Sequence, residues 1–132
     1  MQFPGQKRAD GVFAPLLEVE FRFPNDPRTH LALVDSGADW TIIPAELLPS
    51  SIVYADLGEP TEGEGVGGTF EMRRCHAEVW FQRWKVNDWF FVIEPGKMIT
   101  PAVLLGRHDF MGRFTVTFDW KVAPGTVWVT KR

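Results

Sequence analysis

The stretch "ALVDSGADWTIIP" (residues 32–44) decides how this sequence is interpreted. Its apolar beginning, residues 32–34, leads directly into Asp35, Ser36 and Gly37, and apolar residues resume at Trp40. A carboxylate at the end of a buried strand is either a turn or cap residue or a group kept for chemistry. The three residues Asp-Ser-Gly alone favour the turn, so any other interpretation needs support from the rest of the chain.

Length, charge and cysteine content limit what the protein can be. The 132 residues are enough for one domain with a core but too few for two lobes around a cleft. A net charge of -3 without a basic run argues against nucleic acid as a partner. No apolar stretch reaches membrane-span length, and the first residues lack the apolar core of a signal peptide. Cys75 is the single cysteine, which favours a reducing compartment. We therefore expect a soluble, cytoplasmic protein without a membrane partner.

Alternating and apolar runs predict a chain built mostly of strands. Residues 16–23 place Leu17, Val19 and Phe21 on one face and charged residues on the other, as in a half-buried strand. Further strands are predicted over residues 29–34, 40–44, 72–86, 89–94 and 102–106, and a closing hairpin over 114–120 and 126–130.

The connections between these strands leave little room for helix. A tight turn is predicted at Asn87-Asp88, and short helical turns are predicted over residues 45–49 and 107–114. Residues 1–15 are polar and rich in proline and glycine, so they are expected to form a flexible N-terminal arm before a single domain of residues 16–132. The pattern indicates an all-β domain, closed or sandwiched and antiparallel.

Residues 58–70, "GEPTEGEGVGGTF", concentrate glycine more than a packed element would. One interpretation is a hairpin that opens and closes over a ligand, because glycine tolerates positive φ at a mobile tip. The other is a flexible surface loop, which the glutamates of the stretch would also suit.

Three motifs, taken in order, resemble those of the retropepsin-type aspartic proteases, the single-domain relatives of the pepsins. They are "DSGAD" (35–39) for the catalytic loop, "GVGG" (65–68) for the flap tip and "TPAVLLGR" (100–107) for the segment under the loop. The resemblance covers roughly residues 16–120. It implies an all-β acid-protease fold, a closed β barrel with one short C-terminal helix, that acts as a homodimer.

The resemblance assigns chemistry to the catalytic loop. Asp35 would be the catalytic residue, and because only one such motif is present, a second copy of the chain would supply the other aspartate. Two carboxylates about 3 Å apart share one proton, so one can act as base toward water and the other as acid toward the carbonyl. Ser36 would lie at the dimer axis, and Gly37 would let the loop turn. Asp39 would pair with Arg107 and brace the loop.

The resemblance also implies a groove for an extended polypeptide. Its substrate-binding residues would be Ala38, Trp40, Gly65, Val66, Gly67 and Gly68. Trp40 could equally be an ordinary core residue. Water is the nucleophile, so no metal and no cofactor are expected.

Two other functions stay open on the sequence. One is a module of the same fold that binds a peptide or protein without cutting it. The other is a metal- or thiol-dependent hydrolase, although Cys75 and His76 are neighbours on a predicted strand and would point to opposite faces.

Residues 114–132 are longer than the C-terminal part of viral enzymes and resemble the closing hairpin of a pepsin lobe. This leaves open whether a dimer would interleave its terminal strands.

Overall fold

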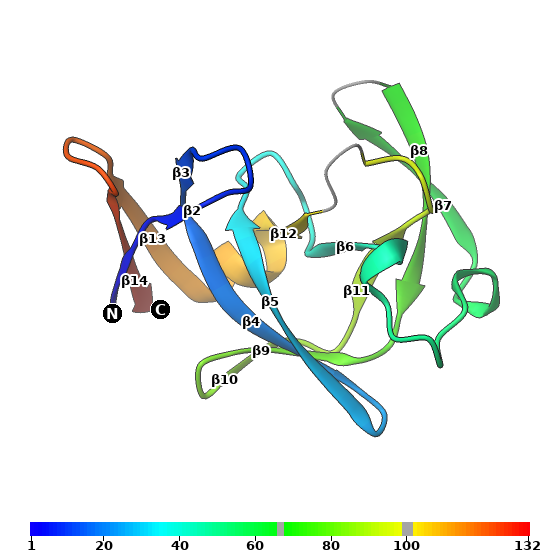
Figure 1. Ribbon diagram of the computed structural model, residues 1–132. Helices are drawn as coiled ribbons and strands as arrows, with labels where there is room; N and C mark the ends of the chain where they lie inside the picture. Colours follow the sequence, from blue (N-terminus) through cyan, green and yellow to red (C-terminus); the bar gives the residue numbers. More distant parts are fainter. Residues whose placement is uncertain (66–67, 99–101) are drawn as a thin grey trace.

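The computed structural model describes residues 1–65, 68–98 and 102–132, which form strands joined by short helical turns (Figure 1). The strands are β1 (Gln2–Pro4), β2 (Gln6–Lys7), β3 (Phe13–Ala14), β4 (Leu16–Phe23), β5 (Asp26–Val34), β6 (Ile42–Pro44), β7 (Pro60–Gly65), β8 (Gly68–Cys75), β9 (Glu78–Phe81), β10 (Trp84–Asn87), β11 (Phe90–Ile93), β12 (Val103–Leu105), β13 (Phe114–Asp119) and β14 (Thr126–Lys131). The helical turns are η1 (Ala45–Leu47), η2 (Tyr54–Asp56) and η3 (Arg107–Met111). None of the helical turns in these residues is long and apolar enough to cross a membrane.

One large sheet has the strand order β10-β9-β4-β5-β12-β6-β11-β8-β7. It curls, but its edge strands β10 and β7 lie far apart (Figure 1) and do not pair in the described part of the chain. The mostly β fold is therefore confirmed, whereas the sheet forms a half-barrel instead of the expected closed barrel. Strand β12 runs parallel to β5, so residues 103–105 lie beside the strand that leads into Asp35.

Several strand predictions are confirmed. Strand β4 buries Leu17, Val19, Phe21 and Phe23, as the alternation predicts. The C-terminal hairpin is the antiparallel pair β13–β14.

The prediction of one long strand over residues 72–86 is wrong. The chain leaves β8 after Cys75 and turns back between β9 and β10, where Gln82 has a φ of 55°. The tight turn predicted at Asn87-Asp88 does not join paired strands either, because β10 pairs with β9 while β11 pairs with β6 and β8. Apolar side chains continue through both breaks because each short strand contributes to the same core, so hydrophobicity alone does not mark the turns.

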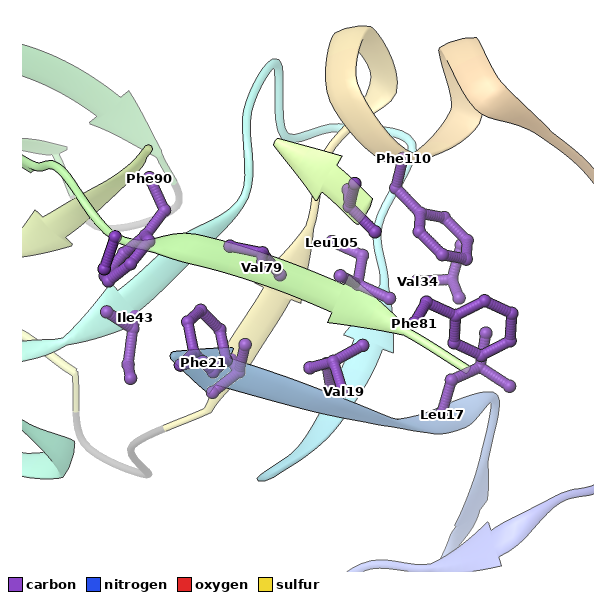
Figure 2. Close-up of a cluster of buried hydrophobic side chains, with 14 of the residues drawn as sticks. Leu17, Val19, Phe21, Val34, Ile43, Val79, Phe81, Phe90, Leu105 and Phe110 are labelled. Atoms are coloured by element: carbon purple, nitrogen blue, oxygen red, sulfur yellow. The ribbon is translucent and has the colours of Figure 1, made fainter. Parts of the chain in front are cut away.

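The core lies inside the curl of the sheet and joins it to the C-terminal elements (Figure 2). Phe81 is fully buried, and its ring centroid lies 5.7 Å from that of Phe3, 5.4 Å from Phe110 and 5.3 Å from Phe114. These aromatic contacts connect β9 to β1, η3 and β13. One strand of the large sheet is thus packed against both ends of the chain.

The first residues pair with the last ones. Strand β1 extends the terminal hairpin to a three-stranded sheet of order β1-β14-β13, with Phe3 opposite Val127. The terminal amine of Met1 donates a 2.7 Å hydrogen bond to the carbonyl of Val129, and both ends lie side by side in Figure 1. Within residues 1–15, β1 pairs with β14 and β2 pairs with β3, pairings that composition does not report. The flexibility of this N-terminal arm stays a prediction. The domain boundary at residue 16 stays a prediction.

Phe81→Ala is expected to lower the free energy of unfolding by about 3–5 kcal/mol, because it removes a buried ring and leaves a cavity among three others. Phe118→Ala is the matched control, since that side chain is 47% exposed and should cost less than about 1 kcal/mol. Urea unfolding followed by tryptophan fluorescence measures both. Equal losses in the two variants would contradict the core described here.

Candidate functional site

The loop after β5 holds the Asp35 carboxylate in a fixed position. The Asp35 N–H donates to the carbonyl of Leu105 at 3.1 Å, which keeps the loop attached to β12. The Gly37 N–H donates to Asp35 Oδ1 at 2.8 Å, and the Ala38 N–H donates to the Asp35 carbonyl at 3.1 Å. Asp35 is half-buried, while Ser36 and Gly37 are exposed. The carboxylate is therefore oriented by the backbone and still open to a ligand.

The segment after β12 crosses the loop at very short range. The Arg107 N–H donates to the carbonyl of Ala38 at 2.8 Å, and the His108 N–H donates to that of Asp39 at 2.9 Å. A Cβ on Gly106 would lie 2.3 Å from the carbonyl carbon of Trp40. Only glycine allows two backbones to approach this closely.

A buried polar pair, Thr41 and Asp109, fastens the same crossing. Asp109 accepts hydrogen bonds from the N–H of Thr41 at 3.0 Å and from its neighbour Phe110 at 2.8 Å. The Thr41 hydroxyl in turn accepts from the N–H of Gly106 at 3.4 Å. Neither residue was predicted from the sequence, although a carboxylate directly before Phe110, in the turn after an apolar strand, was a usable signal.

Asp39 and Arg107 form the pair that the resemblance implies. Arg107 Nη2 lies 2.5 Å from Asp39 Oδ1, and His108 Nε2 lies 3.9 Å from the same oxygen. The hydrogen bond from Arg107 lowers the pKa of the Asp39 carboxyl below its ordinary value. Both side chains are more than half exposed, so we assign the pair to orientation of the loop end and not to stability.

Two adjoining cavities lie between the Asp35 loop and the β7–β8 hairpin, and the inner one reaches Asp35. The inner cavity, about 430 Å³, is lined by Asp35, Gly37, Ala38, Ile42, Glu64, Gly65, Phe70, Ile93, Lys97, Met98 and Leu104. The outer cavity, about 280 Å³, is lined by Gly37, Ala38, Asp39, Trp40, Ile42, Glu62, Gly63, Glu64, Phe70, Met72 and Phe91. Together they form a groove with a mainly apolar floor that ends at a carboxylate, an arrangement suited to binding a flexible chain with apolar side chains.

The hairpin over the groove shows why glycine is concentrated there. A Cβ on Gly63 would lie 2.5 Å from the ring of Phe70, so the glycine leaves room for that ring, which lines both cavities. Gly65 pairs with Gly68, whose φ of 114° favours glycine. Val66 and Gly67, also predicted to bind substrate, lie outside the described residues.

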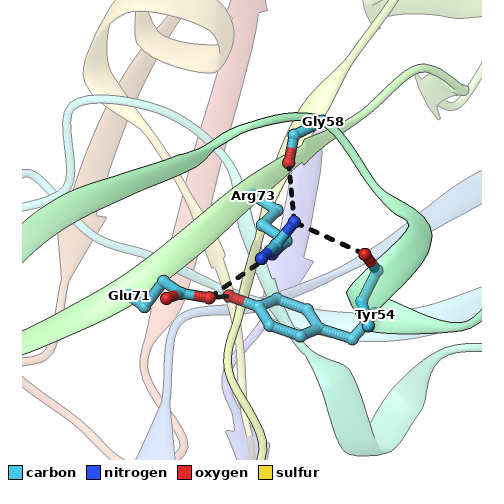
Figure 3. Close-up of polar contacts among 5 residues, drawn as sticks. Tyr54, Gly58, Glu71 and Arg73 are labelled. Carbon is cyan, nitrogen blue, oxygen red and sulfur yellow. Dashed lines mark hydrogen bonds and ion pairs between the residues drawn. The ribbon is translucent and has the colours of Figure 1, made fainter.

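A polar cluster fixes the base of the hairpin (Figure 3). The Tyr54 hydroxyl donates to Glu71 Oε1 at 2.9 Å, and Arg73 Nε donates to the same oxygen at 3.3 Å. Arg73 Nη1 donates to the carbonyls of Ala55 and Gly58, both at 3.4 Å. Burial and then the hydrogen bond to Glu71 raise the pKa of Tyr54 to about 12. Strand β8 is thereby attached to η2 and the turn that follows it.

The other nucleophile and metal candidates lack supporting geometry. Cys75 is buried, and burial raises the pKa of its thiol to about 11, which disfavours the reactive thiolate. Within residues 1–65, 68–98 and 102–132, no three His, Cys, Asp or Glu side chains are grouped to hold a metal ion.

Comparison with known proteins identifies one family. The family described as retroviral aspartyl protease matches residues 14–118, which include the Asp35 loop, the β7–β8 hairpin and Arg107. A search among curated proteins finds no match.

Gly106→Ala is expected to destabilise the protein by about 1–3 kcal/mol and to displace the loop of residues 35–41, because the clash is with backbone that cannot rotate away. Gly112→Ala is the control, since its Cβ would have no neighbour closer than 3.8 Å and its backbone is helical. Thermal unfolding and amide chemical shifts of the loop measure the two effects. A Gly106→Ala protein with parental stability and unchanged shifts would contradict the close crossing.

Proposed function

Because this chain belongs to the retroviral aspartyl protease family, we propose that it is an aspartic endopeptidase that hydrolyses peptide bonds of an extended polypeptide. The observation that carries the proposal is the Asp35 carboxylate, oriented by the Gly37 N–H and lying at one end of an apolar groove. The alternative interpretation of Asp35 as a plain turn residue does not account for the groove beside it.

The proposed chemistry needs two carboxylates that share one proton. The ionised one takes a proton from a water molecule, whose oxygen bonds to the carbonyl carbon of the substrate. The protonated one gives its proton to the carbonyl oxygen. When the tetrahedral intermediate collapses, the C–N bond breaks and the leaving nitrogen takes up the proton of one carboxyl. The other carboxylate takes up a hydroxyl proton of the intermediate, which restores a dyad with one proton.

One chain supplies one Asp35, so we propose that two copies meet about a two-fold axis with the two loops facing each other. Ser36 is exposed beside Asp35, where its hydroxyl could bond to the backbone of the other copy. The partner in this proposal is the chain itself, and no cofactor is required.

The proposed substrate binds as an added strand. Strand β7 is an edge of the large sheet, so its outer backbone groups have no partner strand in the described residues. An extended peptide in the groove can use such groups, while the cavities take its side chains. A cytoplasmic location stays a prediction.

A binding module with the same fold is the second candidate, since the groove would serve it equally well. It predicts tight binding of a peptide that stays intact. The thiol-dependent alternative is weakened by the buried Cys75.

Asp35→Asn is expected to abolish cleavage by reducing it at least about 1,000-fold, because asparagine keeps the size of the side chain but cannot accept the proton. Asp88→Asn, at an exposed carboxylate outside the groove, is the matched control and should cleave normally. Mass spectrometry of a digested peptide library reads the result, and circular dichroism checks the fold. Near-parental cleavage by purified Asp35→Asn protein would exclude the proposed mechanism.

Specific activity is expected to rise with enzyme concentration and to follow a bell-shaped pH profile. A monomer holds half of the site, so dilution below the dimer dissociation constant should remove activity. Cleavage requires one proton on the dyad, so it should fall where both carboxylates are ionised and again where both are protonated. A dilution series at several pH values, with sedimentation velocity on the same samples, measures both. Constant specific activity where only monomer sediments would contradict a site shared between two copies.

A further inference from the structure

The floor of the groove is a hydrophobic cluster distinct from the main core. It contains the buried residues Ile42, Phe91 and Ile93. Partly buried hydrophobic residues packed against it are Trp40, Phe70, Met72, Trp89, Met98 and Leu104. An apolar cluster that stays partly open at a groove has capacity to bury further apolar surface from a ligand.

This cluster is divided between the two cavities. Ile93, Met98 and Leu104 line the inner cavity beside Asp35, and Trp40, Met72 and Phe91 line the outer one. Ile42 and Phe70 belong to both, so the cavities share a wall. Side chains on one face of an extended peptide are about 6.6 Å apart and belong to residues i and i+2. Two adjacent cavities along a groove therefore match alternate residues of one bound strand.

Trp40 lines the outer cavity and packs against two other aromatic rings. Its ring centroid lies 4.9 Å from that of Trp89 and 5.1 Å from the imidazole of His108. The Arg74 guanidinium covers Trp89 at 3.9 Å from the ring centroid. A side chain fixed this way loses little conformational entropy when a ligand packs on it.

Three acidic residues, Asp39, Glu62 and Glu64, also line the outer cavity. Asp39 is paired with Arg107. Glu62 and Glu64 alternate along β7 with Gly63, whose missing Cβ would point at the Phe70 ring, so their side chains start from the opposite face of the strand. Beside these acidic residues, the outer cavity offers a substrate the aromatic and aliphatic side chains of Trp40, Ile42, Phe70, Met72 and Phe91.

We infer that Trp40 determines specificity: the outer cavity accepts a large apolar side chain, preferably aromatic, two residues away from an apolar residue in the inner cavity. This inference rests on the proposed function for the identity of the ligand, a substrate polypeptide. It assigns a substrate class, peptides with two bulky apolar residues separated by one residue.

The test begins with a randomised peptide library, in which cut peptides should show the i, i+2 apolar pair. Matched peptides then carry Phe, Ala or Arg at the outer position and are otherwise identical. We expect kcat/KM for Phe to exceed that for Ala by about 10-fold or more, since a hydrophobic pocket discriminates at about this level. Arg should not exceed Phe. Trp40→Ala should reduce the Phe-to-Ala ratio to about 1, and Trp40→Phe should restore most of it.

Trp80→Ala is the matched control. Trp80 lies on β9 against the Arg22 guanidinium and outside both cavities, so its removal should leave the ratio unchanged. A ratio measured on one enzyme sample does not depend on how much of that sample is folded, so loss of stability in a variant cannot produce the expected result.

Binding of the same peptides to Asp35→Asn protein, followed by fluorescence anisotropy, separates this inference from the proposed function. Cleavage without the apolar pair, or a preference for Arg at the outer position, overturns the inference and leaves the endopeptidase in place. Binding with the expected preference but without cleavage by the parental protein overturns the endopeptidase and supports the two subsites. Peptides that neither bind nor are cut overturn both.

Discussion

The close crossing of two backbone segments is the constraint on which the rest of the site depends. Residues 38–41 and 106–109 are joined by backbone hydrogen bonds, and Gly106 permits the approach because any Cβ would overlap the backbone of Trp40. The buried pair Thr41 and Asp109 adds polar contacts that are satisfied within the crossing. Because these contacts fix both ends of the loop, Asp35 can be partly exposed without losing its orientation. The same crossing puts Trp40 at the groove and Arg107 beside Asp39.

The parts of the fold that local patterns determine could be predicted. The alternation of apolar and charged residues predicts β4, because it depends only on residues that are neighbours in the sequence. The three motifs are short and local as well, and their order predicts which segments lie near Asp35. Apart from the Asp39–Arg107 pair that the resemblance implies, contacts between distant residues could not be predicted in this way. Thr41 and Asp109 are 68 residues apart, and the groove floor combines side chains from β6, β8 and β11 that look like core residues in the sequence. The pairing of β1 with β14 is carried by backbone groups, which have no signature in side-chain composition.

The terminal sheet bears on how two copies could meet. In this chain β14 has β1 on one side and β13 on the other, so its backbone groups are paired within one molecule. A dimer that interleaved terminal strands would have to separate β1 from β14 and lose the contacts of Phe3 with Phe81. Strand β14 therefore already has, within one chain, the strand partners that an exchange of terminal strands between two copies would provide. In the proposed dimer, two copies would then associate without rearrangement of the termini.

The proposed mechanism needs a second carboxylate beside Asp35. Glu64 is the other acidic residue that lines the inner cavity, so it is the candidate within one chain for a partner of Asp35. Its side chain leaves β7 on the face opposite to Gly63 and Gly65, whose missing Cβ atoms would point toward the Phe70 ring, and it lies on a hairpin instead of a braced loop. A dyad needs both carboxylates fixed at about 3 Å, because only then does the repulsion between two ionised groups force them to share a proton. The Gly37 N–H fixes the orientation of the Asp35 carboxylate. A two-fold axis beside Ser36 would bring in a second Asp35 that is oriented in the same way. Symmetry is therefore the simplest way for this chain to provide two equally oriented carboxylates.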